Sequence, residues 1–306
     1  MTTTPALQIE SLRKKFGDNI AVKGLTLQVD QGEVFGFLGP NGAGKTTSIK
    51  MLLGLISPTS GYASLLGHPI GDRLVRAQIG FLPEHFRFHD WLTANEFLIL
   101  HGQLFGMEDK QIRSRVNELL DLLGLTAFSN KQLRTFSKGM LQRIGIAQAL
   151  LNNPRLIFLD EPTSGLDPVG RRLVRDIIHD LRDKGTTVFI NSHLLSEIEV
   201  TCNRVAFIKH GEVLKIIELN KSLDGQVSLS VKTRNLVPEI IQNLNKWGQE
   251  IRVDDNTLTM VVADENILPA INQFLVENKV EVYSFIPQRI SLEDIFIQTV
   301  GTDGGL

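Results

Sequence analysis

The sequence is poor in cysteine, since Cys202 is the single one among 306 residues. One cysteine can form neither an internal disulfide nor a cysteine zinc cage, which excludes disulfide-stapled and zinc-finger proteins. Its position in a segment predicted to be helical favours a buried apolar role. The sequence also has no stretch of 18 apolar residues, so no transmembrane helix is predicted.

The sequence has no excess of charge of either sign. Its 32 basic and 34 acidic side chains give a formal net charge of -2. Proteins dedicated to nucleic acids usually carry a strong basic excess, so we expect no nucleic-acid partner. The start "MTTTPALQIESLRKK" lacks the charged-then-apolar order of a secretory signal, which together with the lone cysteine fits a reducing interior.

The hydrophobic content of 42% suffices for a substantial core, divided between more than one domain. Alternating segments predict several strands over residues 7–38, and residues 45–55 have the pattern of a helix. A helical insert is expected over about 85–150, where "TANE" forms a capping box. The order of "RLIFLD", a helix and "TTVFINS" predicts a βαβ unit in a parallel sheet, followed by a hairpin in "RVAFIKHGEVLKIIE".

From about residue 224 the order of elements changes to strand, helix, strand, strand, helix, strand, with a last helix in "SLEDIFIQTV". The βαββαβ order is that of the ferredoxin-like arrangement. We therefore expect an α/β domain over 1–220 and a small α+β domain with a ferredoxin-like order of elements over 221–306.

The segment "GPNGAGKTT" follows a predicted strand and precedes a predicted helix, as a phosphate-binding loop requires. Its glycines let backbone amides approach a phosphate, Lys45 can reach the β and γ phosphates, and the Thr46 hydroxyl can ligate Mg²⁺. The alternative is a glycine-rich turn with a fortuitous lysine. The predicted nucleotide-binding residues here are Gly39, Pro40, Asn41, Gly42, Ala43, Gly44, Lys45, Thr46 and Thr47.

Two carboxylates end the hydrophobic strand "LIFLDEP". Parallel strand ends gather beside the phosphate loop, which places Asp160 to hold Mg²⁺ through water and Glu161 to orient or deprotonate the attacking water. His193, after the next strand, is a candidate to stabilise the charge of the transition state. The alternatives are a solvated loop for the acidic pair, and a helix start formed by Ser192 and His193.

Taken together, these residues resemble the ATP-binding subunit of an ABC transporter over about residues 7–220. The order of motifs carries the resemblance: Walker A at 39–47, the signature at 137–140, Walker B and the catalytic glutamate at 160–161, "SGLD" as the D-loop at 164–167, and His193 as the switch histidine. The resemblance implies P-loop fold, ATPase activity with ATP and Mg²⁺, and two cassettes that close head to tail. Each signature then caps the nucleotide of the other cassette, which implies roles for Ser137, Gly139 and Asp167.

Two positions depart from the usual family residues. Phe16 stands where the family usually has the tyrosine that stacks on adenine, and a phenyl ring can still stack; its alternative is a buried strand residue. Glu84 stands at the usual Q-loop glutamine, where a carboxylate can approach Mg²⁺ or its water but donates no hydrogen bond when ionised.

The forms "LPE", "SKGM" and "SLEDIFIQTV" resemble the branch paired with ABC-2 type membrane subunits, which often export their cargo. The implied partners are a polytopic permease on a separate chain and a second cassette, identical or related. The implied location is the cytoplasmic face of the cell membrane. Residues 85–91 either contact the permease or pack within the insert.

Two other functions remain open from the residues. A soluble ABC ATPase that remodels DNA or ribosomes would usually bring a coiled-coil insertion, a zinc-binding cysteine set, a second cassette or a basic excess, and none is present in this sequence. In a P-loop kinase, the segments "FSKGM" and "SGLD" would have no function.

The signature itself has an unusual charge. Ser137 is a good N-cap for the helix that follows, whereas Lys138 in its first turn opposes the helix dipole. An anion delivered to this terminus would reverse that penalty, so Lys138 is expected to help electrostatically beside the contacts made by Ser137 and Gly139. The bland alternative is a solvated lysine.

Overall fold

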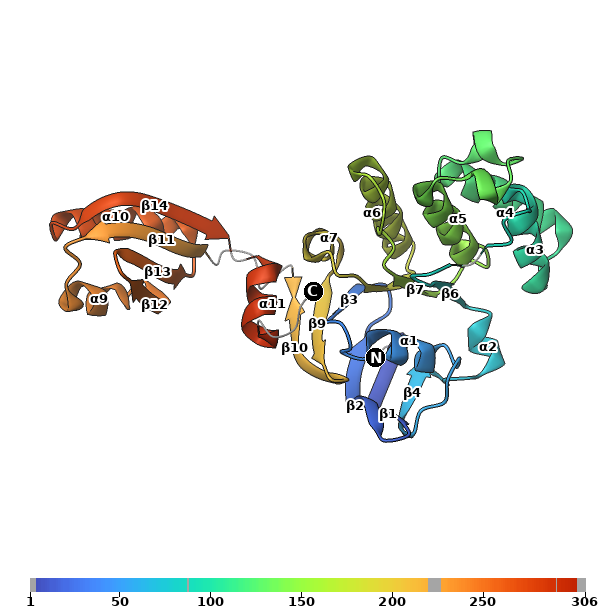
Figure 1. The fold of residues 1–306 in the computed structure, drawn as a ribbon, viewed down its shortest axis with the longest axis horizontal. Coiled ribbons are helices and arrows are strands. Elements are labelled where there is room, and N and C mark those ends of the chain that lie inside the picture. The colour runs from blue at the N-terminus through green and yellow to red at the C-terminus, as the bar shows by residue number, and fades with distance from the viewer. Residues whose placement is uncertain (1–3, 87, 220–226, 290, 302–306) are drawn as a thin grey trace. The chain divides into compact units, whose positions relative to one another are not determined.

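The computed structural model describes residues 4–86, 88–219, 227–289 and 291–301. Contacts divide the chain into two compact units (Figure 1): Met1–Ile217 with Thr299–Leu306, which we call the cassette, and Glu218–Gln298. The domain boundary expected at 220 and 221 lies outside the described residues. The sequence groups the last helix with the second domain, whereas the contacts group its final residues with the cassette. There the carbonyl of Val300 accepts a hydrogen bond from Lys209 Nζ at 2.7 Å.

A six-stranded sheet forms the centre of the cassette, with strand order β10-β9-β3-β8-β7-β6. Its strands are β3 (Val34–Leu38), β6 (Ile79–Leu82), β7 (Leu156–Asp160), β8 (Thr187–Asn191), β9 (Arg204–Lys209) and β10 (Glu212–Glu218). The pairs β3–β8, β3–β9, β7–β8 and β6–β7 are parallel. Every residue of β3, β7 and β8 is buried, as expected for strands covered on both faces. The predicted βαβ unit and the hairpin of β9 and β10 are confirmed.

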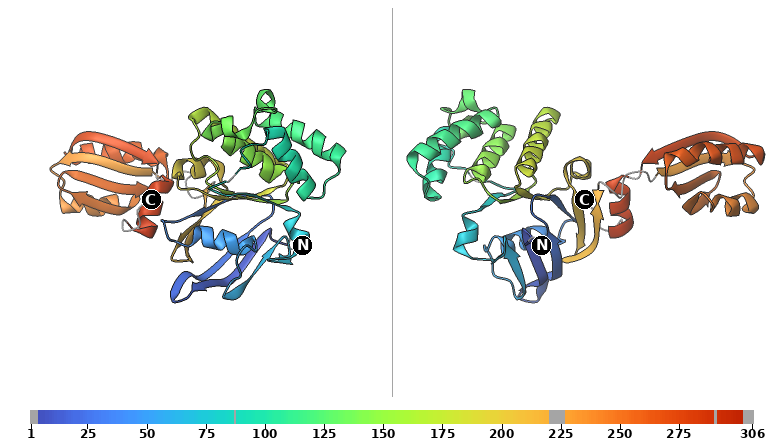
Figure 2. Two further views of the ribbon diagram at one scale, coloured as in Figure 1. Left: turned by 45° about the vertical axis from the view of Figure 1, so that its right-hand side comes forward. Right: turned by 180° about the vertical axis from the view of Figure 1, so that it is seen from behind.

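Helices cover both faces of this sheet (Figures 1 and 2). Helix α1 (Lys45–Leu52) lies on one face, and α5 (Lys138–Leu150) and α6 (Pro168–Asp183) lie on the other. Beyond α1 lies a second sheet of order β2-β1-β4-β5. Its members are β1 (Leu7–Phe16), β2 (Asn19–Val29), β4 (Ser60–Leu65) and β5 (His68–Pro69). A continuous apolar core joins the two sheets through α1, so the phosphate loop that starts α1 is held between them.

The helical insert contains α3 (Ala94–Leu104), α4 (Asp109–Leu122) and α5, and the short α2 (Arg73–Arg76) precedes it. The predicted capping box at the start of α3 is confirmed, because Thr93 and Glu96 exchange side-chain-to-backbone hydrogen bonds. Helix α7 (Leu195–Thr201) follows β8 and ends at Cys202, which is buried as predicted. Among the described residues, no helix has both the length and the apolar composition needed to cross a bilayer.

The second unit has the strand order β12-β13-β11-β14 with every neighbouring pair antiparallel, which is the predicted ferredoxin-like arrangement. Its elements are β11 (Val227–Arg234), α9 (Pro238–Leu244), β12 (Gly248–Asp254), β13 (Thr257–Val262), α10 (Leu268–Glu277) and β14 (Glu281–Arg289). Alternate residues of β11 and β13 are buried, and they form a core with α9 and α10. Helix α11 (Leu292–Val300) then leads back to the cassette.

Candidate nucleotide site

The phosphate loop connects the end of β3 to the start of α1. Gly42 and Gly44 adopt left-handed φ angles of 78° and 96°, which glycine tolerates best. A Cβ atom on Gly44 would lie 2.6 Å from the carbonyl oxygen of Ala21, so this position also requires glycine for space. No side chain caps the start of α1, and its first amides therefore remain available to an anion.

Lys45 lies at the centre of the site. Its ammonium donates hydrogen bonds to the carbonyl oxygens of Gly39 at 2.5 Å and Pro40 at 3.1 Å. Burial lowers the pKa of Lys45, and the negative charges of Glu161, Asp160 and Glu84 act in the opposite direction. The lysine is thus a partly desolvated cation, which raises the strength of its attraction to phosphate.

A cavity of about 620 Å³ lies over the phosphate loop, within the size range of small-molecule sites. Glu84, Glu161 and His193, three of the predicted site residues, meet the loop there. The complete lining is Asn19, Ile20, Ala21, Gly39, Asn41, Gly42, Ala43, Gly44, Lys45, Thr46, Thr47, Glu84, Glu161, Asn191 and His193.

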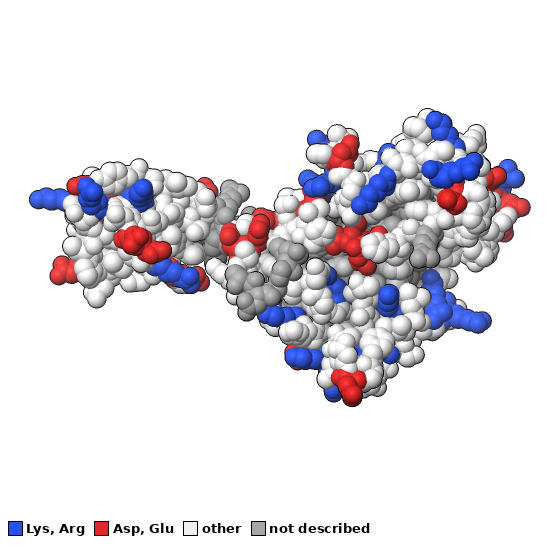
Figure 3. Space-filling model, viewed as in Figure 1, with Lys and Arg blue, Asp and Glu red and all other residues white. Residues whose placement is uncertain are grey.

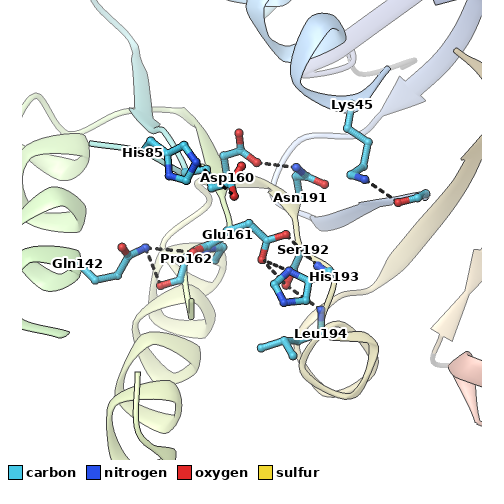
Figure 4. A network of polar contacts seen from close by, with 12 residues as sticks. Lys45, His85, Gln142, Asp160, Glu161, Pro162, Asn191, Ser192, His193 and Leu194 are labelled. Carbon is cyan, nitrogen blue, oxygen red and sulfur yellow. Dashed lines mark hydrogen bonds and ion pairs between the residues drawn. The ribbon is translucent and has the colours of Figure 1, made fainter. Parts of the chain in front are cut away.

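Asp160 ends β7 beside the end of β8, the neighbouring parallel strand. Its carboxylate accepts a hydrogen bond from the side-chain amide of Asn191 at 2.5 Å (Figure 4). Burial raises the pKa of Asp160, and the charges of Glu84 and Glu161 raise it further, whereas Asn191 and Lys45 lower it. A buried carboxylate in this position costs stability unless a cation joins it.

Glu161 is held in an unusual backbone conformation, with a φ angle of 53°, and its side chain is buried. The carboxylate accepts hydrogen bonds from the backbone N–H of His193 at 2.9 Å and from Ser192 Oγ at 3.3 Å. His193 Nδ1 lies 2.8 Å from the same carboxylate (Figure 4). A non-glycine residue is strained in this backbone region, so the contacts around Glu161 must hold it there.

The side chain of Gln142 contacts the same segment from α5. Its amide donates to the carbonyl oxygens of Glu161 at 3.0 Å and Pro162 at 3.1 Å (Figure 4). The catalytic candidate is therefore fixed through its carboxylate on one side and its main chain on the other.

A second cavity gathers other predicted site residues. Ser137, Gly139 and Asp167 line a second cavity of about 540 Å³ beside the start of α5. Ser137 caps α5 as predicted, accepting from the backbone N–H of Met140 at 3.3 Å, and Asp167 caps α6 through the N–H of Gly170 at 2.7 Å. The chain thus carries the phosphate loop and the signature in two separate cavities.

The structure distinguishes some of the open alternatives. Phe16 is 50% exposed instead of buried, and it pairs with Asn19, which lines the nucleotide cavity. The helix after β8 begins only at Leu195, and Ser192 Oγ accepts from the N–H of Leu194. Ser192 therefore contributes to the helix start, whereas the His193 ring is directed to Glu161.

Gln142 and Asn191 also contact the site, and neither is among the residues that the sequence predicts there. Asn191 is predictable from the sequence, because it ends β8 as Asp160 ends β7, and the ends of neighbouring parallel strands lie together. Gln142 is harder to predict, since it lies five positions beyond Ser137 on a helix whose packing the sequence does not define.

The donors at the phosphate loop fit a magnesium ion that arrives with a nucleotide. Mg²⁺ in such sites takes phosphate oxygens, waters and one or two protein ligands. Thr46 and Asn191 line the cavity, and Asp160 accepts a hydrogen bond from Asn191. Among the described residues there is no group of three or more His, Cys, Asp or Glu side chains that could hold a metal by themselves, which fits an ion shared with phosphates.

Comparisons with known proteins agree with this geometry. Residues 22–164 match the ABC transporter family, and residues 215–300 match the C-terminal domain of DrrA1-3-like ATP-binding proteins. An uncharacterised ABC transporter ATP-binding protein of Synechocystis is 42% identical over 93% of this chain and 79% of its own. The Nod factor export ATP-binding protein I of Cupriavidus metallidurans is 32% identical over 98% of this chain and 99% of its own.

A solved ATP-binding subunit of an ABC transporter superposes with a TM-score of 0.66 at 30% identity, covering 71% of this chain and 91% of its own. The chain belongs to the ATP-binding subunits of ABC transporters, and it is an ATP-binding cassette that hydrolyses ATP. The DrrA-like C-terminal domain confirms the predicted resemblance to the ABC-2 exporter branch.

Proposed function

We propose that this cassette powers export by closing on a second cassette around ATP. The observation that carries the proposal is the division of the motifs between two cavities, one with the phosphate loop and one with Ser137 and Gly139. Head-to-tail pairing of two cassettes would bring each signature to the other's nucleotide. The side chain of Lys138 lies against Gly165 of the D-loop. In such a pair this loop would face the partner too.

In the proposed site, Lys45 and the amides of α1 bind the β and γ phosphates. Thr46 and, through water, Asp160 hold Mg²⁺, which would neutralise charge on the phosphates. Glu161 orients or deprotonates the attacking water, and His193 stabilises the transferred phosphoryl group. Glu84 lies near enough to affect the pKa of both Lys45 and Asp160, which supports a place close to the metal.

Phe16 and Asp167 complete the proposed site. The exposed Phe16 ring would stack on adenine, and Asp167 would order the D-loop beside the partner's nucleotide. Asp167 caps the start of α6 next to the signature cavity, which supports this role.

The proposed partner in the membrane is a polytopic permease on a separate chain, which would place the cassette at the cytoplasmic face. Export is supported by the DrrA-like domain and by the name of the Nod factor export relative. On the face shown in Figure 3, acidic and basic side chains of the described residues are interspersed, which gives no support to a nucleic-acid partner. Recovery from native membranes with ribosomes or DNA instead of a membrane protein would contradict this.

The substitution Glu161→Gln tests the core of the proposal. The amide retains the size of the side chain but cannot act as a base, so we expect ATP binding to remain and turnover to fall at least 100-fold. ATP should then trap a closed dimer, visible by size-exclusion chromatography with light scattering. Glu118→Gln, an exposed change on α4, is the control. Undiminished ATPase activity in Glu161→Gln would remove Glu161 as the catalytic residue.

A further inference from the structure

Asn191 is a buried polar residue in the nucleotide site. It ends β8, it is 3% exposed, and it lines the cavity over the phosphate loop. Its side-chain amide donates to Asp160, while its side-chain oxygen is buried and accepts no hydrogen bond from the residues that the structure describes. In Figure 4 this oxygen lies on the side of Lys45.

An unsatisfied buried acceptor is unfavourable for folding. An apolar residue of the same size would fill this position on a fully buried strand without that cost, as Ile190 and Phe189 do before it. The unpaired side-chain oxygen of Asn191 is thus the part that the fold does not need, whereas its amide is the part that holds Asp160. Residues that break local rules in this way concentrate at functional sites.

We propose that Asn191 is a positioning residue for the magnesium ion: its amide fixes the Asp160 carboxylate so that one oxygen is bound and the other is presented to a water of the metal. This inference rests on the proposed magnesium site. Mg²⁺ requires nearly ideal octahedral geometry, so a carboxylate free to rotate would hold its water poorly. Groups that orient metal-binding carboxylates commonly change metal affinity 10- to 100-fold.

The charge of the orienting group matters as much as its geometry. Asp160 is already influenced by Lys45, and by the negative charges of Glu84 and Glu161. A second cation at residue 191 would neutralise the carboxylate and compete with the metal, and a carboxylate there would repel it. A neutral amide orients Asp160 and leaves its charge available to Mg²⁺.

The test measures nucleotide binding without turnover. Isothermal titration calorimetry with AMP-PNP is run on the full chain, in Mg²⁺ and in EDTA. For Asn191→Leu we expect the affinity for AMP-PNP in EDTA to stay within twofold of the unsubstituted chain. The factor by which Mg²⁺ increases that affinity, which we call the magnesium gain, should fall at least tenfold. Asn191→Ser, a smaller change, should show the same pattern if the leucine variant folds poorly.

Thr187→Val is the matched control, since Thr187 is equally buried on the same strand but binds the backbone of Gly32. It should keep the full magnesium gain. A full gain in Asn191→Leu or Asn191→Ser would overturn the inference, as would equal losses in EDTA and Mg²⁺, which would indicate a general packing role. No magnesium gain in the unsubstituted chain would instead contradict the proposed function.

Discussion

At the residue scale, Asp160 shows how the site trades stability for chemistry. Its carboxylate is 2% exposed, and burial is the first cause of its raised pKa. A carboxyl whose folded pKa is raised favours the folded state most below its unfolded pKa near 4, and this contribution is lost as pH rises through the folded pKa. The nucleotide-free cassette therefore carries an electrostatic cost at neutral pH.

We expect Asp160→Asn to raise the melting temperature of the nucleotide-free protein at pH 7 by about 2 to 4 °C, the shift that roughly 1 kcal/mol produces in a domain of this size. The gain should shrink as pH falls and disappear near pH 4, because the aspartic acid is then neutral as well. Thermal unfolding followed by circular dichroism between pH 4 and 8 measures it.

Asp121→Asn, an exposed substitution on α4, should leave the melting temperature unchanged across the same range. If Asp160→Asn instead lowered stability at pH 7, the hydrogen bond from Asn191 would outweigh the cost of burial.

At the element scale, α5 connects the signature to the catalytic segment. Ser137 caps its start in one cavity, and Gln142, just over one turn later, holds the carbonyls of Glu161 and Pro162 beside the other. One helix therefore contacts both the signature cavity and the main chain of Glu161.

Gln142→Leu should lower kcat roughly 10-fold and leave the KM for ATP within twofold. The reason is that it frees the strained main chain of Glu161, at a cost of about 1.4 kcal/mol in transition-state stabilisation, without touching the phosphate loop. Steady-state ATPase kinetics separate the two parameters. Gln148→Leu, on the same helix and without a hydrogen bond to this segment, is the control. Equal changes in kcat and KM for both variants would indicate a general effect of packing.

The sequence was sufficient for elements whose signal is local. The alternation of β1 and β2, the buried runs of β7 and β8 and the cap at Ser137 all depend on neighbours within a few positions. The left-handed conformation of Glu161 and the reach of Gln142 across 19 residues of sequence depend on packing of the insert against the sheet, which no local pattern encodes. Glycine would be the residue expected from sequence at such a φ angle.

At the scale of the whole molecule, the described residues among 85–91 include both packed and exposed aromatic rings. The ring centroids of Phe86 and Phe88 lie 4.4 Å apart, and both rings pack against Phe97 of α3. These rings therefore belong to the insert. Trp91 is 62% exposed, with His89 at 5.2 Å beside it. Exposed tryptophan is enriched where proteins meet, which makes Trp91 the element of this segment that is available to a permease.

Trp91→Ala should reduce the amount of permease that co-purifies with the full-length cassette at least 10-fold, because an aromatic anchor commonly contributes about 2 kcal/mol or more to an interface. ATPase activity of the cassette without the permease should stay the same. Tyr283→Ala removes a comparably exposed ring, at 60%, from the second unit and serves as the control. Unchanged recovery of the permease with Trp91→Ala would exclude this residue from the contact.

The second unit is interposed in the chain of the cassette instead of appended to it, because Thr299 and Val300 rejoin the first unit. The chain therefore leaves the cassette after Ile217 and returns to it at Thr299. Truncation before α11 would therefore take Thr299 and Val300 from the cassette while the strands of the second unit, with α9 and α10, stay in the chain.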